Sequence, residues 1–251
     1  MSPPALETRG LTKTFGALVI ANAIDFRLEW GARHALIGPN GAGKTSFVNL
    51  VTGALPANAG QILLDGVDVT HLPEAARVKR GLVRTFQITA LFRGLSVLEN
   101  VALAVCERDG VAGDPWHPIG SHRRAIEKAF ALIERMGLTD DAGQPVGTLA
   151  YGRQRLIEIA VALALEPRVL LLDEPAAGVP SGETARIIEA VESLPSDIAV
   201  LIIDHDMNLV FRLAQWITVL VQGSVLVEGP PQAISAHPGV RQVYLGERFA
   251  R

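Results

Sequence analysis

The sequence contains little cysteine, few aromatic residues and no long apolar run. One cysteine in 251 residues, Cys106, excludes an internal disulfide and suits a reducing compartment, and we expect it to be a small core or surface residue. No apolar stretch reaches the length of about 18 residues that a membrane helix requires, and the N-terminal residues lack the basic-then-apolar pattern of a signal peptide. These absences predict a cytoplasmic protein, which can still dock on a membrane-embedded partner.

An excess of basic residues is also missing. The formal net charge is −3, from 23 Lys and Arg against 26 Asp and Glu, so the chain has no positive field of the kind that holds nucleic acid. We therefore expect no nucleic-acid partner. The hydrophobic content of 49% is ordinary for a globular protein, and the length fits one large domain or a domain with an inserted lobe.

Strand-like and helix-like patterns alternate along most of the chain. The apolar segments RHALIG, VLLLDEP and IAVLIIDHD are each followed by a helical pattern, which indicates buried parallel strands. Residues from about 88 to 149 carry helical periods instead, with a Gly/Pro/His loop between two of them. The sequence therefore predicts an α/β fold with a mainly parallel sheet and a helical insertion.

The segment GPNGAGKT matches the pattern G-x-x-x-x-G-K-[ST] in full and lies between a predicted strand and a predicted helix. In such a loop, backbone N–H groups converge on phosphate oxygens at a helix N-terminus. Lys44 is expected to neutralise the β- and γ-phosphates, and the Thr45 hydroxyl to bind Mg²⁺. A plain glycine-rich turn is the alternative, which the strand-loop-helix setting disfavours. The predicted nucleotide-binding residues of this loop are Gly38, Pro39, Asn40, Gly41, Ala42, Gly43, Lys44, Thr45 and Ser46.

Two carboxylates, Asp173 and Glu174, follow the buried strand VLLLD, at the edge of a parallel sheet where ligands bind. An Asp there can hold Mg²⁺, and a neighbouring Glu can orient or deprotonate a water that attacks the γ-phosphate. A helix N-cap plus a solvated acid is the alternative. The phosphate loop earlier in the chain favours the catalytic interpretation.

Three further side chains are candidates for the same site. His205 follows the strand IAVLIID and can hydrogen-bond the γ-phosphate, although a single histidine is more often structural. Gln87, at the junction with the helical insertion, can ligate Mg²⁺ or hold water, and can equally be a surface residue. Phe15 can stack on an adenine ring, and can equally belong to the core.

The chain resembles the ATPase subunit of ATP-binding cassette (ABC) transporters over nearly its whole length. The resemblance is carried by five motifs in this order: GPNGAGKT, RTFQ, LAYGRQRLIEIA, LLLDEP and IIDHD. The resemblance implies a P-loop NTPase core over residues 1–87 and 164–251, with a small N-terminal antiparallel β region, and an α-helical subdomain over residues 88–163. It assigns Lys44 and Thr45 to the phosphates and Mg²⁺, Gln87 to sensing, Asp173 to the metal, Glu174 to the attacking water, and His205 to the γ-phosphate. It also matches Phe15 to the aromatic residue that stacks on adenine.

The segment from Leu149 carries the family's signature in altered form, because the usual LSGGQ is LAYGR here. The resemblance implies that this segment contacts ATP held by a second ATPase subunit, through its backbone and the N-terminal end of a helix from about Arg153. Ala150 lacks the usual serine hydroxyl, and Pro180 stands where many relatives carry Asp or Asn. The residues assigned to this contact in trans are Ala150, Tyr151, Gly152, Arg153 and Gln154.

Four segments of the sequence look like the subfamily that drives branched-chain amino-acid uptake. They are RTFQITALFRGLSVLENV, YGRQRLIEIA, DHDMNLVF and the tail that ends in VYLG. That resemblance implies an importer in which two ATPase subunits, identical or sister chains, work with two permeases and, indirectly, a periplasmic binding protein. The cofactors implied are ATP and Mg²⁺, and the location is the inner face of the membrane. Relatives carry other amino acids, urea or small organic acids, so the cargo stays open.

Other classes remain as alternatives at this point. They are a non-transport ABC ATPase, an ATP-dependent regulatory switch, and a small kinase that shares the phosphate loop. The segment ITALFRGLSVLEN is expected either to dock a permease helix or to pack as an ordinary amphipathic helix on its own domain.

Overall fold

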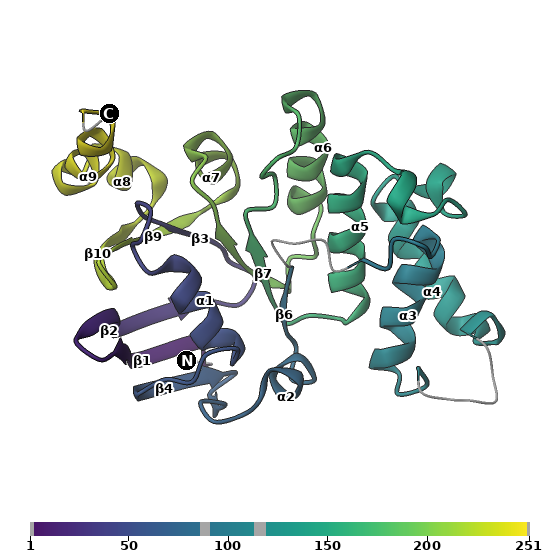
Figure 1. The fold of residues 1–251 in the computed structure, drawn as a ribbon, viewed down its shortest axis with the longest axis horizontal. Coiled ribbons are helices and arrows are strands. Elements are labelled where there is room, and N and C mark those ends of the chain that lie inside the picture. Colours follow the sequence, from purple (N-terminus) through teal and green to yellow (C-terminus); the bar gives the residue numbers. More distant parts are fainter. Residues whose placement is uncertain (1–2, 86–90, 113–118, 250–251) are drawn as a thin grey trace. The chain divides into compact units, whose positions relative to one another are not determined.

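Two sheets organise the strands of the computed structural model, which describes residues 3–85, 91–112 and 119–249 (Figure 1). The first sheet is antiparallel, with strand order β2-β1-β4-β5. Its strands are β1 (Leu6–Phe15), β2 (Leu18–Leu28), β4 (Ala59–Leu64) and β5 (Val67–Asp68). The second sheet is mostly parallel, with strand order β10-β9-β3-β8-β7-β6. Its strands are β3 (Arg33–Ile37), β6 (Leu82–Arg84), β7 (Val169–Asp173), β8 (Ala199–Ile203), β9 (Trp216–Val221) and β10 (Ser224–Gly229).

Helices follow most of the parallel strands, as the sequence predicts. The α-helices of the described residues are α1 (Lys44–Thr52), α2 (Glu74–Val78), α3 (Val97–Arg108), α4 (Arg123–Arg135), α5 (Tyr151–Ala164), α6 (Ser181–Glu192), α7 (Met207–Leu213), α8 (Pro231–Ala236) and α9 (Pro238–Phe249). Short 3-10 turns are η1 (Ile119–Ser121), η2 (Thr139–Asp141) and η3 (Val146–Thr148). In the described part of the chain, none of these helices has the length and apolar character needed to cross a membrane. The predicted α/β class with a small antiparallel sheet is confirmed.

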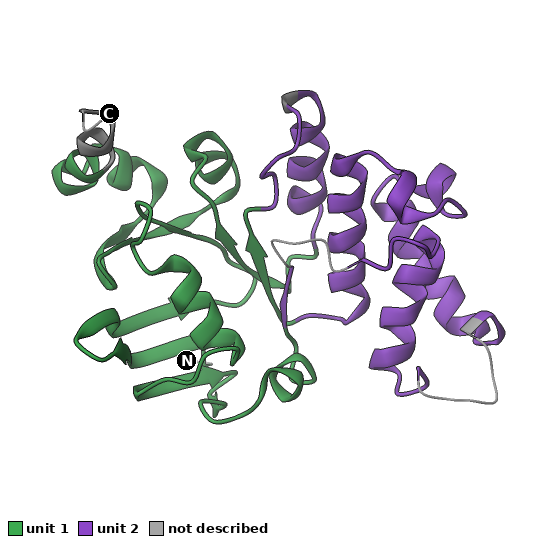
Figure 2. Ribbon diagram, viewed as in Figure 1, with its two compact units in different colours: residues 1–82, 168–174, 195–251 green, residues 83–167, 175–194 purple. Residues whose placement is uncertain are grey.

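The chain divides into two compact units (Figure 2). Unit 1 comprises Met1–Leu82, Arg168–Glu174 and Pro195–Arg251, and unit 2 comprises Val83–Pro167 and Pro175–Leu194. Unit 2 thus contains α6 as well as the helices of the middle of the chain. The subdomain boundaries expected at residues 88 and 163 stay a prediction.

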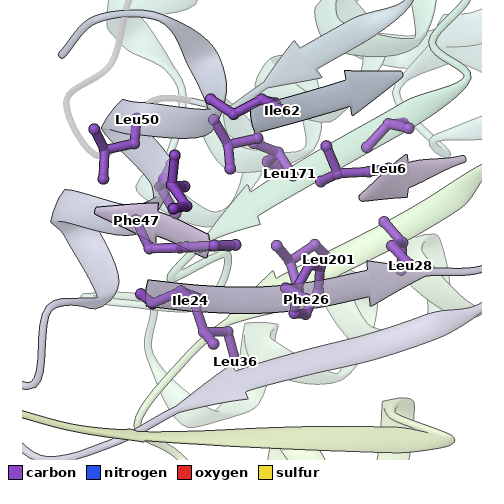
Figure 3. Packing of buried hydrophobic residues seen from close by; sticks show 14 of the residues in the cluster. Leu6, Ile24, Phe26, Leu28, Leu36, Phe47, Leu50, Ile62, Leu171 and Leu201 are labelled. Carbon is purple, nitrogen blue, oxygen red and sulfur yellow. The ribbon is translucent and has the colours of Figure 1, made fainter. Parts of the chain in front are cut away.

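The core of unit 1 lies around α1, which packs between the two sheets (Figure 3). Phe47 of α1 is fully buried and meets Phe26 of β2 edge to face, with 5.3 Å between ring centroids. Leu171 and Leu201 contribute to the same cluster from the parallel strands β7 and β8. Because α1 carries the end of the phosphate loop, this packing fixes the position of that loop on both sheets.

In unit 2, helix α5 is buried on nearly every side by α3, α4 and α6. The apolar residues Leu156, Ile159, Ala160 and Leu163 are buried. The polar residues Gln154, Arg155 and Glu158 are also buried, although an amphipathic helix would expose them. Helix α5 is therefore the central helix of this unit.

Strand β1 has no counterpart among the strands that the sequence suggested. Its residues Leu6 to Phe15 alternate polar and apolar side chains, but a register shift and a positive φ of +56° at Gly10 interrupt the pattern. Cys106 lies in the core of unit 2 and is fully buried. Of the two environments expected for it, the core is the correct one.

Candidate nucleotide-binding site

The phosphate loop joins β3 to α1 with the conformation that the motif requires. A methyl group at Gly38 would overlap the carbonyl oxygen of Leu220, and one at Gly43 would lie 2.7 Å from the carbonyl oxygen of Ile20. Gly43 also has a φ of +102°, which favours glycine. Only glycine fits these two positions without displacing backbone, so the glycines bring the loop close to β2 and to the end of β9.

The N-terminus of α1 is free to receive an anion. Its N-cap is Gly43, which has no side chain to cap the helix, and its first turn contains no acidic residue. The first N–H groups and the positive end of the helix dipole therefore face the loop. Lys44 donates hydrogen bonds to the carbonyl oxygens of Gly38 at 2.5 Å and Pro39 at 3.0 Å. Its ammonium group thus lies over the loop, and the exposed Thr45 follows it in the first turn of α1.

The turn between β9 and β10 supports the loop from the other side. The N–H of Gly223 donates to the carbonyl oxygen of Ala42 at 2.9 Å, and the carbonyl oxygen of Gly223 accepts from the N–H of Asn22 at 2.8 Å. Strand β2, this turn and the phosphate loop are therefore joined by backbone hydrogen bonds. The β1–β2 hairpin is fixed beside the loop as a result.

Phe15 is at the tip of that hairpin, paired with Leu18 across the turn. Its side chain is 55% exposed, so the alternative that it belongs to the core is wrong. The ammonium of Lys13 lies 5.0 Å from the centroid of the Phe15 ring. An exposed aromatic ring beside a phosphate loop is chemically suited to stack on a nucleobase.

The parallel strands bring the predicted catalytic residues to one edge of the sheet. The register pairs Asp173, the last residue of β7, with Ile203, the last residue of β8, and pairs Ile203 with Leu36 of β3. The residues that follow these strands are therefore neighbours at the edge where α/β proteins bind ligands. The phosphate loop, Asp173, Glu174 and His205 all belong to unit 1.

Glu174 and His205 are in direct contact at this edge. The Nδ1 atom of His205 lies 3.3 Å from Oε1 of Glu174. The His205 side chain is 67% exposed, so it is not a buried structural histidine. Glu174 has a φ of +48°, an uncommon conformation for a glutamate, and its N–H is held by the carbonyl oxygen of Ile203 at 2.7 Å. Backbone strain of this kind is frequent where a side chain must be presented to a ligand.

Asp204 orders the loop that carries His205. Its Oδ1 accepts hydrogen bonds from the N–H groups of His205 at 2.7 Å and Asp206 at 2.9 Å. Burial raises the pKa of the Asp204 carboxyl, against the lowering effect of those two N–H groups. The short side chain of Asp204 therefore closes a local turn beneath the histidine.

The side chains near the loop suit a magnesium ion that is held mainly by a nucleotide. Among the described residues, no group of three or more His, Cys, Asp or Glu residues could hold a metal by itself. Mg²⁺ in phosphate sites takes only one or two protein oxygens and is otherwise bound by phosphates and water. The buried carboxylate of Asp173 and the hydroxyl of Thr45 are hard oxygen donors of this type. Gln87, also expected to bind the metal, lies outside the described residues.

The altered signature segment begins helix α5 in unit 2. The helix starts at Tyr151, two residues before the start expected near Arg153, because Ala150 is extended and serves as its N-cap without a side-chain hydrogen bond. Gln154 donates to the carbonyl oxygen of Leu149 at 2.8 Å, and Arg153 forms an ion pair with Asp141. Both long polar side chains are thus bound within unit 2, and Tyr151 is exposed.

Gly152 is buried against α6. A methyl group there would overlap Oε2 of Glu183 and would lie 3.1 Å from the Glu183 Cβ atom. A methyl group at Gly178, in the loop before α6, would lie 3.3 Å from the Tyr151 ring. The start of α5 is therefore held to the start of α6 by two close approaches at glycine.

Comparison with known proteins identifies the family. The family described as ABC transporter matches residues 21–177. The chain belongs to the ABC transporter family. The family described as branched-chain amino acid ATP-binding cassette transporter matches residues 224–250. ABC cassettes hydrolyse ATP, and this chain is an ATP-binding ABC ATPase.

The similar proteins cover nearly the whole chain. The high-affinity branched-chain amino acid transport ATP-binding protein BraF of Pseudomonas aeruginosa is 40% identical, over 98% of this chain and 100% of BraF. The corresponding protein LivG of Escherichia coli is 38% identical, over 98% of this chain and 100% of LivG. The solved structure of the ADP conformation of MJ1267, an ATP-binding cassette of an ABC transporter, superposes with a TM-score of 0.85 at 28% identity, over 98% of this chain and 99% of that one.

Two residues of this ABC cassette were not singled out from the sequence. Lys13 lies two positions before Phe15, and the period of two along a strand places both on one face, which was the available signal. Glu183 lies in the first turn of α6, and its contact with Gly152 joins segments far apart in the sequence. No local pattern indicates such a contact.

Proposed function

We propose that this ABC ATPase is the ATP-hydrolysing subunit of an importer for branched-chain or related amino acids, or for small organic acids. The observation that carries the proposal is the match of residues 224–250 to the branched-chain family, in addition to the general ABC match. The identity of 40% to BraF over the full length supports it.

The phosphate loop is proposed to hold ATP. The N–H groups of the loop and of the first turn of α1 bind the phosphate oxygens. Lys44 exchanges its hydrogen bonds to the Gly38 and Pro39 carbonyl oxygens for bonds to the β- and γ-phosphates. Phe15 stacks on the adenine ring.

Hydrolysis is assigned to the pair Glu174 and His205. Glu174 accepts the proton of the water that attacks the γ-phosphate, and His205 donates a hydrogen bond to a γ-phosphate oxygen. The contact of 3.3 Å between the Nδ1 atom of His205 and Oε1 of Glu174 holds the two side chains beside each other. When bound through Thr45, Asp173 and Gln87, Mg²⁺ neutralises charge on the β- and γ-phosphates.

Coupling to transport requires a second ATPase subunit, identical or a sister chain. Ala150, Tyr151, Gly152, Arg153 and Gln154 are proposed to face the ATP of that subunit, with the N-terminal end of α5 directed at its γ-phosphate. ATP that contacts both subunits only in the closed state favours closure by the difference in its affinity for the two states. Hydrolysis removes that difference and lets the subunits part.

The permease is proposed to bind unit 2 near the start of α3. Phe92 is exposed there, and its backbone N–H is bound by the side chain of Asn100 at 2.9 Å. The body of α3 packs against α4 and α5, so part of the expected docking segment serves its own unit. Docking on permeases would hold the protein at the inner face of the membrane, and a periplasmic binding protein would deliver the cargo.

Reconstituted uptake tests this function. The chain is purified with its permease subunits and second ATPase subunit, placed in proteoliposomes with the cognate binding protein, and supplied with internal Mg-ATP. We expect uptake of labelled leucine, isoleucine or valine, and none with Lys44→Ala. ATP turnover that is not increased by the binding protein and any of these amino acids, urea or small organic acids would contradict the importer function.

A further inference from the structure

The exposed ring of Phe15 needs a device that fixes its orientation. It lies at the end of β1, directly before a tight turn at Gly16, where few neighbours restrict its rotation. A ring that rotates freely loses entropy when a base stacks on it, and that loss weakens binding. A contact that orients the ring beforehand would therefore strengthen the stack.

Lys13 provides such a contact. Lys13 is only 8% exposed. Lysine is rarely buried to this degree without a partner anion. Within residues 3–85, 91–112 and 119–249, no carboxylate forms an ion pair with Lys13. Its Nζ atom instead lies over the ring of Phe15, 5.0 Å from the ring centroid. The electron-rich face of an aromatic ring attracts a cation, and the attraction is stronger where the pair is shielded from water.

The hairpin places this pair beside the phosphates. The carbonyl oxygen of Ile20, in β2, lies against Gly43, the N-cap of α1. Leu18, two residues before Ile20 in β2, pairs with Phe15 of β1. A nucleotide whose phosphates occupy the loop therefore carries its base toward the ring. The ammonium approaches one face of the ring, and a base stacks on the other.

From this geometry we infer that Lys13 is a positioning residue for the nucleobase, acting through the ring of Phe15. The inference rests on the proposed function only in that Phe15 stacks on the base of ATP. When a base covers the exposed face of the ring, water leaves Phe15, and a cation–π contact strengthens as the ring is desolvated. The cation also draws electron density from the ring, which favours stacking of an electron-rich purine. Lys13 thus increases affinity for a purine nucleotide and leaves the affinity for the phosphate chain alone unchanged.

The test compares ATP with inorganic tripolyphosphate, which lacks base and ribose. Dissociation constants are measured by calorimetry for the parent protein, Lys13→Met, Lys13→Arg, Phe15→Leu and the double variant Lys13→Met/Phe15→Leu. Lys79→Met is the matched control, because it removes the same charge from an exposed position of the same unit. Thermal unfolding of each variant verifies that it is folded.

We expect Lys13→Met to weaken ATP binding about five-fold, from the loss of a desolvated cation–π contact. Tripolyphosphate binding stays unchanged, Lys13→Arg retains most of the affinity for ATP, and Lys79→Met has no effect. In the Phe15→Leu background, removal of Lys13 has no further effect on ATP. Equal weakening of ATP and tripolyphosphate, an unchanged affinity for ATP, or an effect that persists without Phe15 would each overturn the inference. If the parent binds neither ligand, the proposed nucleotide site itself fails.

Discussion

The Nδ1 atom of His205 lies 3.3 Å from Oε1 of Glu174, across the carboxyl ends of the adjacent parallel strands β7 and β8. The contact joins the two residues assigned to the γ-phosphate and to the attacking water. Its geometry follows from the register of the sheet, since Asp173 pairs with Ile203, Glu174 directly follows Asp173, and His205 lies two residues after Ile203.

Replacement of His205 separates binding from turnover. His205→Gln removes the imidazole while leaving the phosphate loop intact, so we expect ATP affinity to persist and turnover to fall by about 10²-fold. Phosphate release under saturating Mg-ATP measures turnover, and calorimetry measures affinity. Asn208→Ala, two residues into α7, is the control. Turnover near the parent rate would exclude a role of His205 at the γ-phosphate.

Because His34 is buried, we expect the protein to lose stability in mild acid. Burial lowers the pKa of this histidine from 6.5 to about 4, against a hydrogen bond that the ring donates to the backbone of Arg27, which raises the pKa. Protonation therefore disfavours the folded state, and stability falls as pH drops from about 6.5 to about 4 by roughly 3 kcal/mol. Urea unfolding across this range measures the loss, and His34→Gln should flatten it. The exposed His71→Gln serves as the control, and an unaltered pH profile in His34→Gln would contradict the assignment.

The buried pair Arg155 and Glu158 predicts non-additive changes in stability. The two side chains, 5% and 7% exposed, are joined at 2.7 Å within α5. Arg155→Met or Glu158→Leu alone removes one charge of the buried pair and keeps the other, and should cost about 3–5 kcal/mol. The double variant removes both charges and should cost much less. Equal and additive losses in denaturant unfolding would contradict a buried ion pair.

Because Gly152 lies against Glu183, we expect a substitution at Glu183 to restore the stability lost by a substitution at Gly152. Gly152→Ala places a methyl group against the Glu183 side chain, so it should destabilise unit 2, although alanine is the better helix former by about 1 kcal/mol. In a Glu183→Ala background the same change should lose most of its cost. Denaturant unfolding of the four proteins measures the coupling. A cost of Gly152→Ala that is independent of Glu183 would mean that another contact requires the glycine.

The gathering of the candidate residues of unit 1 could be predicted, because each lies at or just after the end of a parallel strand. Lys44 and Thr45 come after β3, Asp173 and Glu174 lie at the end of β7, and His205 comes after β8, so the sheet brings them to one edge. Their roles stay predictions. The exposure of Phe15 could not be predicted, because an aromatic residue at a strand end suits either a core or a stacking surface.

The features of unit 2 that escaped prediction depend on non-local packing. The period of α5 indicated one apolar face, whereas α3, α4 and α6 cover the helix on nearly all sides and bury Arg155 and Glu158. Gly152 was expected to admit a phosphate, and in the structure Glu183 also explains why a glycine is present there. The role of Gln87 stays a prediction.

The most direct measurement is made on Glu174→Gln, which keeps the size and most hydrogen bonds of the side chain and removes its basicity. Phosphate release and light scattering after gel filtration are recorded with and without Mg-ATP, with Lys44→Ala as the variant that should not bind ATP productively. We expect turnover to fall by at least about 10²-fold while an ATP-dependent dimer persists. Hydrolysis at near the parent rate would contradict Glu174 as the base of this ABC ATPase.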